Sequence, residues 1–183
     1  MNRSNNRTRQ WLLCALFAAL TAICSQIQIP LPMVPINLAL FSVHMAGALL
    51  GVKYGSISML IYLLLGLVGA PVFTGLVGGA GILFGQTGGY IVGYVIAAAI
   101  VGLLRQKWGE RFFQLCLAMV LGVAACYLFG TIWFMVITHN PLWTSLMYCV
   151  FPFLPGDAVK ILLAATLCHK LLPILRRNGW IPA

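Results

Sequence analysis

Apolar residues run through the chain in long continuous stretches, which short polar, proline-rich or glycine-rich segments separate. A membrane-spanning helix requires about 20 predominantly apolar residues, and most of the stretches approach or exceed that length. Their apolar positions are continuous rather than alternating, which argues against an outer-membrane β-barrel. The pattern therefore predicts an all-α membrane protein with six spanning helices, at residues 11–29, 36–51, 55–70, 88–104, 112–138 and 155–172.

The composition supports this fold class. Of the 183 residues, 62% are hydrophobic and only 7% are charged, whereas soluble domains carry about 25% charged residues. This excludes a soluble enzyme and a disordered chain. The first apolar run is too long for the core of a signal peptide and no A-x-A site follows it, so we expect it to remain as the first helix. One transmembrane domain is expected at residues 11–175, with tails at 1–10 and 176–183.

The placement of basic residues predicts the orientation. If the N-terminus is cytoplasmic, six spans place ten of the eleven Lys and Arg residues in cytoplasmic segments. Cytoplasmic loops are enriched in these residues, so we expect both termini in the cytoplasm of a multi-pass protein of a bacterial cell membrane. The net charge of +9 then reflects topology, and no nucleic-acid partner is expected because a basic water-exposed face is missing.

Lys160 is the basic residue that does not follow this pattern. It lies in the first turns of the last span, toward the outer side, and Asp157 shares its helix face three residues earlier. A lysine near the membrane centre costs roughly 2.5–3.5 kcal/mol, and the helix dipole disfavours a cation at a helix start. The pair predicts either a structural ion pair or a binding site. In the latter, Lys160 would meet an anionic group and Asp157 would accept hydrogen bonds from N–H groups.

A glycine-rich segment at residues 66–93 contains ten glycines. Non-helical backbone at membrane depth is tolerated only where protein or a cavity covers it, and glycine allows the backbone to approach a ligand closely. The segment therefore favours a pocket, with a flexible outer loop as the alternative. No G-x-x-x-x-G-K-[ST] motif occurs, so no ATPase site is predicted.

Four stretches, in their order along residues 12–172, resemble the BioY family, the biotin-specific substrate-binding (S) components of energy-coupling-factor (ECF) vitamin transporters. They are ALFAALTA at 15–22, IPLPMVPINL at 29–38, GLVGAPVF…GQTGGYIVGY between 66 and 94, and PGDAVK at 155–160. The resemblance implies a six-helix S-component bundle that captures biotin from the outside. It also implies two kinds of partner, a transmembrane coupling subunit and two ATPase subunits.

The resemblance also implies site residues. In the family, the Asp and Lys that open the last helix contact biotin, and they correspond to Asp157 and Lys160 here. The GQTGGY stretch would line the same pocket through Gln86, Thr87 and Tyr90, and the proline-rich segment at 29–35 would form a lid. Biotin is then the transported ligand rather than a cofactor. Which of its groups meets which residue stays open.

Small residues on the first helix are a candidate partner interface. Ala15, Ala18, Ala19 and Ala22 form two overlapping small-xxx-small pairs, which let helices approach closely in lipid. The resemblance implies that this face packs against the coupling subunit, and the alternative is packing within the chain.

Few other residues suggest chemistry. His44 lies in the second span, where we favour a hydrogen-bonded packing role over a functional one. The six cysteines show no C-x-x-C spacing and are expected to pack as small apolar residues. No catalytic set, metal site or cofactor is predicted. The resemblance, together with the Asp157–Lys160 pair, implies a biotin-binding transport subunit. The alternatives are an S component for another vitamin such as thiamine, a solitary biotin facilitator, and a small membrane enzyme.

Overall fold

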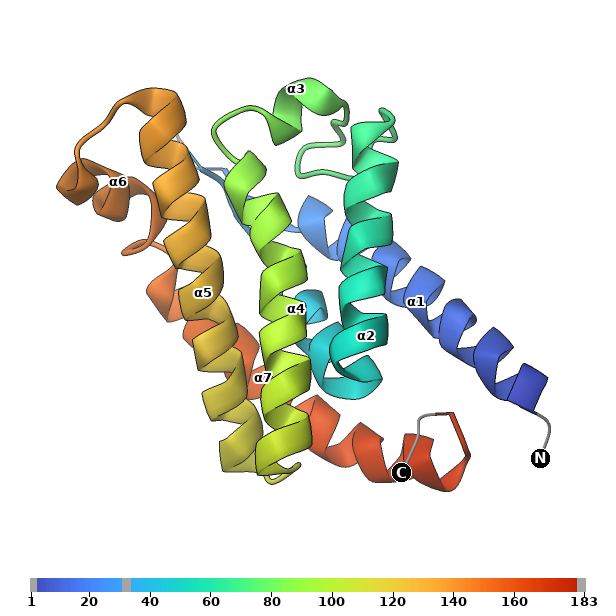
Figure 1. Ribbon diagram of the computed structural model, residues 1–183. Coiled ribbons are helices and arrows are strands. Elements are labelled where there is room, and N and C mark those ends of the chain that lie inside the picture. Colours follow the sequence, from blue (N-terminus) through green and yellow to red (C-terminus); the bar gives the residue numbers. More distant parts are fainter. Residues whose placement is uncertain (1–2, 31–33, 181–183) are drawn as a thin grey trace.

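The computed structural model describes residues 3–30 and 34–180, which form an all-helical bundle with one short β-ribbon (Figure 1). The elements in chain order are α1 (Arg3–Gln26), β1 (Gln28–Ile29), β2 (Ile36–Asn37), α2 (Ala39–Leu67), α3 (Ala80–Leu83), α4 (Gly88–Trp108), α5 (Phe112–Thr138), α6 (Leu142–Cys149) and α7 (Leu154–Arg177). Within the described residues, five helices are long and apolar enough to cross a membrane, namely α1, α2, α4, α5 and α7.

Helix α2 contains both the second and the third expected span. Gly51 interrupts it with non-helical angles, φ 76° and ψ −174°. The two halves fold back on each other, because Ser42 donates to the Thr21 hydroxyl (2.8 Å) and the same hydroxyl lies 3.8 Å from the sulfur of Met59. In a straight helix, residues 42 and 59 would be separated by about 25 Å. The reversal therefore takes place at Gly51, and residues 52–54, which lie between the second and third expected spans, are helical.

Helix α4 packs against both α2 and α5, and glycines make the contact with α2 close. A Cβ at Gly47 would lie 2.6 Å from the carbonyl oxygen of Ala98, and a Cβ at Gly102 would lie 2.5 Å from the backbone nitrogen of Val52. Small residues allow this approach in lipid, where packing rather than hydrophobic burial holds helices together. Helix α1 packs against α2, and α7 packs against α2 and α5.

The outer surface of the bundle is apolar. Each of the five long helices exposes large apolar side chains, among them Leu16, Leu64, Leu103, Leu128 and Leu162. Soluble monomers rarely expose contiguous apolar surface on this scale. The structure is therefore that of a multi-pass membrane protein.

The connecting segments divide between two ends of the bundle. The β-ribbon, in which Gln28 pairs with Asn37, shares one end with α3 and α6. The beginning of α1 and the end of α7 lie at the opposite end, together with the turn between α4 and α5 (Figure 1).

We expect Gly51→Ala to destabilise the protein by about 1–3 kcal/mol, because its backbone angles lie in a region that only glycine adopts readily. Thermal unfolding of the detergent-purified protein measures the effect. Gly81→Ala is the matched control, since a Cβ at this exposed position in α3 meets no atom within 4 Å. Equal melting temperatures for the two variants would show that the reversal in α2 does not depend on Gly51.

Candidate functional site

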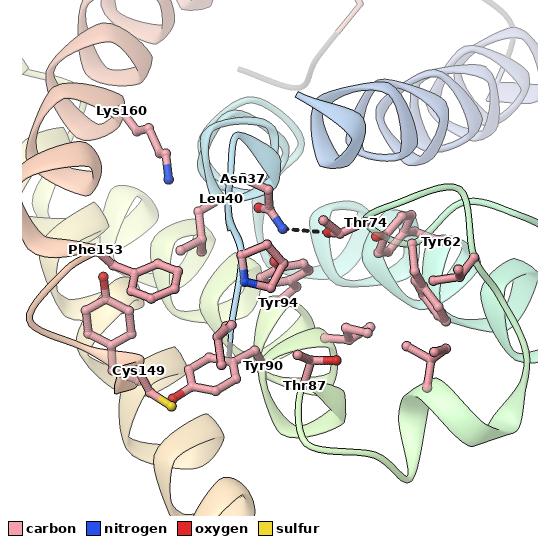
Figure 2. A pocket seen from close by; sticks show the side chains of 17 residues that line it. Asn37, Leu40, Tyr62, Thr74, Thr87, Tyr90, Tyr94, Cys149, Phe153 and Lys160 are labelled. Carbon is pink, nitrogen blue, oxygen red and sulfur yellow. Dashed lines mark hydrogen bonds between the residues drawn. The ribbon is translucent and has the colours of Figure 1, made fainter. Parts of the chain in front are cut away.

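A cavity of about 190 Å³ lies between α2, α4, α5 and α7 and is covered by the connecting segments (Figure 2). Its wall combines aromatic and aliphatic side chains with a few polar groups. The lining residues are Val34, Pro35, Asn37, Leu40, Tyr62, Phe73, Thr74, Val77, Ile82, Thr87, Tyr90, Ile91, Tyr94, Tyr127, Cys149, Phe153 and Lys160. A concave, mostly apolar wall with a few convergent polar groups is typical of a small-molecule site.

Aromatic rings form a large part of this wall. Tyr62 packs edge-on against Phe73, with the ring centroids 5.5 Å apart, and lies 6.4 Å from the ring of Tyr94. These three side chains come from α2, the glycine-rich loop and α4, so tertiary packing alone brings them together. Such rings offer a rigid apolar surface for the body of a ligand.

The polar groups of the wall come from separate elements. Asn37, at the end of the β-ribbon, donates from Nδ2 to the hydroxyl of Thr74 in the glycine-rich loop, at 2.7 Å. Lys160 reaches the wall from α7, and Figure 2 shows it apart from the Asn37–Thr74 pair. The cavity can therefore hold a ligand that has an anionic group and further polar groups at different positions.

Asp157 and Lys160 form a buried ion pair at the start of α7. Lys160 Nζ lies 2.7 Å from Asp157 Oδ1, and the two residues are only 6% and 2% exposed. The phenol of Tyr127, on α5, donates to the other carboxylate oxygen. Lys160 and Tyr127 line the cavity whereas Asp157 does not. The carboxylate therefore lies behind the wall, with both oxygens occupied, and Lys160 presents the positive charge.

A purely structural function explains this ion pair poorly. Removing two charges from water costs several kcal/mol per ion, so replacing a buried pair with apolar residues is often neutral or stabilising. Asp157 gains from its position in the first turn of α7, where the helix dipole favours an anion, but Lys160 does not. Lys160 also lines the cavity, where its positive charge would attract an anionic group.

Helix α4 begins within the GQTGGY stretch, and the residues of the stretch differ in exposure. Tyr90 is buried and its hydroxyl lies 3.1 Å from that of Thr131, while Thr87 is half-buried, and both line the cavity. Gln86 is exposed and is not a lining residue. Gln86 precedes the N-cap residue Thr87, so the turn into α4 leaves it at the surface. Tyr90 and Thr87 therefore line the same cavity as Lys160, whereas Gln86 does not.

Hydrogen bonds with the end of α1 anchor the glycine-rich loop. Ser25, at the end of α1, donates to the carbonyl of Val72, and the Gln26 amide donates to that of Phe73 and accepts from the backbone of Leu76. These bonds hold the loop over the cavity. In the expected lid, Val34 and Pro35 line the wall, and the central residues 31–33 lie outside the described residues.

The four alanines of α1 point in two directions. Ala18 is 2% exposed and belongs to the core, and Ala22 is half-buried against it. Ala15 and Ala19 are exposed. Residues at i and i+4 share a face, so the two expected small-xxx-small pairs differ: Ala15–Ala19 is exposed and open to a partner, whereas Ala18–Ala22 packs within the chain.

His44 is fully buried, and neither ring nitrogen has a hydrogen-bond partner among the described residues. His44 therefore packs in the interior as expected, but without the expected hydrogen bond among the described residues. Five cysteines are buried, and Cys149 in α6 lines the cavity. Burial raises the pKa of the Cys149 thiol, so it is a neutral, weakly polar part of the wall. The described residues contain no group of three or more His, Cys, Asp or Glu that could hold a metal ion.

Sequence reasoning missed most of the wall, including Asn37, Tyr62, Thr74, Tyr94, Tyr127 and Phe153. The tyrosines lie in apolar spans, where an aromatic residue more often belongs to the core or the membrane interface. The sequence position of Asn37 could have indicated a site residue, because it is the polar residue that follows the proline-rich segment. No sequence pattern could have indicated Tyr127, since it lies 30 residues from the carboxylate that it contacts.

Comparisons with known proteins agree with this architecture. The family model described as "BioY family" matches residues 1–177. The chain is 34% identical to "Biotin transporter BioY" of Thermotoga maritima over 163 residues, which cover 89% of this chain and 95% of that protein. It is 37% identical to "Probable biotin transporter BioY" of Pyrococcus horikoshii over 166 residues, or 90% and 97% of the two chains.

A solved structure shares the fold. The crystal structure of "the S-component for biotin from an ECF-type ABC transporter" superimposes with a TM-score of 0.86 at 32% identity, covering 93% of this chain and 94% of that one. The family match, the relatives and the fold agree over nearly the full length. The chain belongs to the BioY family.

Proposed function

We propose that this protein is the biotin-binding S component of a membrane importer and not an enzyme. The observation that carries the proposal is the aromatic cavity with the Lys160 ammonium in its wall, in a chain of the BioY family. Biotin combines an apolar bicycle and alkyl chain with a carboxylate and a ureido group. Those parts match the aromatic rings, the ammonium and the hydrogen-bonding groups of the cavity.

The proposed pose places the biotin carboxylate at Lys160. The ammonium has three donors and Asp157 accepts from one of them, which leaves donors for the ligand. The ureido group would bind the polar side chains of Asn37, Thr74, Thr87 or Tyr90. Asp157 would hold the Lys160 ammonium in place from behind, because its two oxygens are engaged by Lys160 and Tyr127.

The cavity favours biotin over thiamine. Thiamine carries a fixed positive charge, and Lys160 would repel it while the neighbouring carboxylate is already paired. Competition with labelled biotin by a panel of vitamins would distinguish the two ligands.

We further propose six membrane crossings with both termini in the cytoplasm. Each half of α2 would cross once, with the reversal at Gly51. The support is the distribution of charge, because Lys and Arg concentrate in the segments at the end opposite the cavity, as cytoplasmic segments of bacterial membrane proteins do. The cavity would then face the outside of the cell.

ATP-driven uptake would require partners, because the sequence contains no ATP-binding loop. We propose a transmembrane coupling subunit and two ATPase subunits, with Ala15 and Ala19 of α1 as part of the contact. Both alanines are exposed, beside the large exposed side chains of Leu12, Leu16 and Ile23. A solitary facilitator would use the same cavity without this contact.

We expect Lys160→Met to weaken biotin binding at least 100-fold, because it removes the only positive charge among the described residues of the wall. Calorimetric titration of biotin into the detergent-purified protein measures the affinity. Lys170→Met, on the exposed surface of the same helix, is the matched control and should bind like the parent. Unchanged affinity of Lys160→Met would overturn the site assignment.

We expect Tyr127→Phe to weaken biotin binding about tenfold. The change leaves one oxygen of the Asp157 carboxylate without its donor, at a cost of about 1–3 kcal/mol, and loosens the group that positions Lys160. Affinity and melting temperature are both measured. Tyr148→Phe is the control, since Tyr148 is 46% exposed on α6. If Tyr127→Phe lowers only the melting temperature, Tyr127 does not position the site.

We expect the double variant Ala15→Leu, Ala19→Leu to lose the coupling subunit in co-purification while it still binds biotin. Bulky side chains at these positions prevent close helix approach. The matched control is Ala124→Leu, at an exposed position on α5, which should retain the partner. Retention of the partner by the double variant would place the contact elsewhere.

A further inference from the structure

A second depression lies at the basic end of the bundle, far along α7 from the cavity. It has a volume of about 370 Å³ and is lined by Arg105, Gln106, Gly109, Glu110 and Arg176. These residues come from the end of α4, the turn that follows it and the last turn of α7. Two arginines from different helices therefore converge on one open depression.

The depression keeps a positive charge after its internal pairing. Arg176 Nη2 donates to Glu110 Oε1 at 2.6 Å, and Arg105 Nη1 lies 3.6 Å from the same oxygen. One carboxylate thus serves two guanidinium groups, which leaves a net charge of +1. Lys107, Arg111 and Arg177 are exposed nearby in the sequence and add to the positive potential.

Arg105 also has hydrogen-bonding capacity to spare. Its side chain is 10% exposed, its one hydrogen bond among the described residues goes to the carbonyl of Ala48 at 2.9 Å, and its buried Nε has no partner. A guanidinium presents five N–H donors in a planar fork, which suits phosphate oxygens. Arg105 lines the depression, so the terminal N–H donors that no described residue engages are available to an anionic acceptor there.

Aromatic residues at this end of the bundle suit a membrane–water interface. Trp108, Phe113 and Trp180 are exposed at the same end of the chain's helices, and aromatic residues concentrate at the membrane–water interface. With the orientation proposed above, the depression lies on the cytoplasmic side, where basic pockets between helices bind the headgroups of anionic lipids.

We propose that the Arg105–Arg176 depression binds a phosphate group that carries net negative charge. The group comes from an anionic phospholipid headgroup or from free phosphate. It would accept hydrogen bonds from both guanidinium groups, in competition with Glu110. This site is independent of the proposed biotin site.

The test must separate this role from the structural role of Arg105. By donating to Ala48 near the reversal at Gly51, Arg105 satisfies a carbonyl at the end of the first half of α2, so its removal would disturb the fold. Arg176 is exposed and can be changed instead. Arg176→Gln is compared with Arg177→Gln, which removes the same charge from the adjacent exposed position outside the depression.

The full-length protein, purified in detergent, is titrated with dioctanoyl phosphatidylglycerol, dioctanoyl phosphatidylcholine or inorganic phosphate, and binding is measured by native mass spectrometry. We expect phosphatidylglycerol to bind at least tenfold more tightly than phosphatidylcholine, whose choline neutralises the phosphodiester. Arg176→Gln should weaken phosphatidylglycerol about tenfold and Arg177→Gln less than twofold. Binding of inorganic phosphate with the same dependence on Arg176 would identify the free anion as a source.

Glu110→Gln provides a change in the opposite direction. It releases both guanidinium groups from the carboxylate, so phosphatidylglycerol should bind more tightly than to the parent. Equal losses in Arg176→Gln and Arg177→Gln would overturn the proposal in favour of diffuse attraction. Weaker binding by Glu110→Gln, or equal affinity for the two lipids, would overturn it as well.

Discussion

The ion pair between Asp157 and Lys160 constrains the structure around the cavity. Both groups are buried at the start of α7, and each offsets the cost of removing the other charge from bulk water. Tyr127 extends the pair to α5, so the charges connect two helices as well as two side chains. The arrangement puts a positive charge on the cavity side and its counter-ion behind it. A charge fixed in this way favours an anionic ligand over a cationic one.

The cavity also depends on close packing of the backbone. Gly47 and Gly102 let α2 and α4 approach until backbone atoms almost touch, and Gly51 allows α2 to reverse without a loop. At the other end, Ser25 and Gln26 fix the glycine-rich loop to α1. Glycine therefore has two uses here, since it permits contact inside the bundle and irregular backbone at its end, where hydrogen bonds from α1 supply the order.

Helix α7 carries the polar chemistry of the molecule at both ends. Lys160 faces the aromatic cavity near its start, and Arg176 pairs with Glu110 in its last turn. Leu162, Leu163 and Leu167 lie on its exposed side between them. This arrangement, with charges at both ends and apolar residues between them, is typical of a helix that crosses a bilayer. Charged side chains are tolerated there only where they are paired or lie near the interfaces.

The sequence by itself determined the fold class, the family and the Asp157–Lys160 pair, because long apolar runs and a misplaced charge are properties of the chain that need no contacts. Only the tertiary structure decided that Gln86 lies outside the cavity, that Ala18 and Ala22 pack inward, and that the second and third apolar runs meet at Gly51. It also decided the aromatic wall and the contact of Tyr127 with Asp157. The sequence pattern around a tyrosine in an apolar helix is the same whether its side chain faces lipid, the protein core or a ligand. Its role depends on how the helix is rotated and on what packs against it.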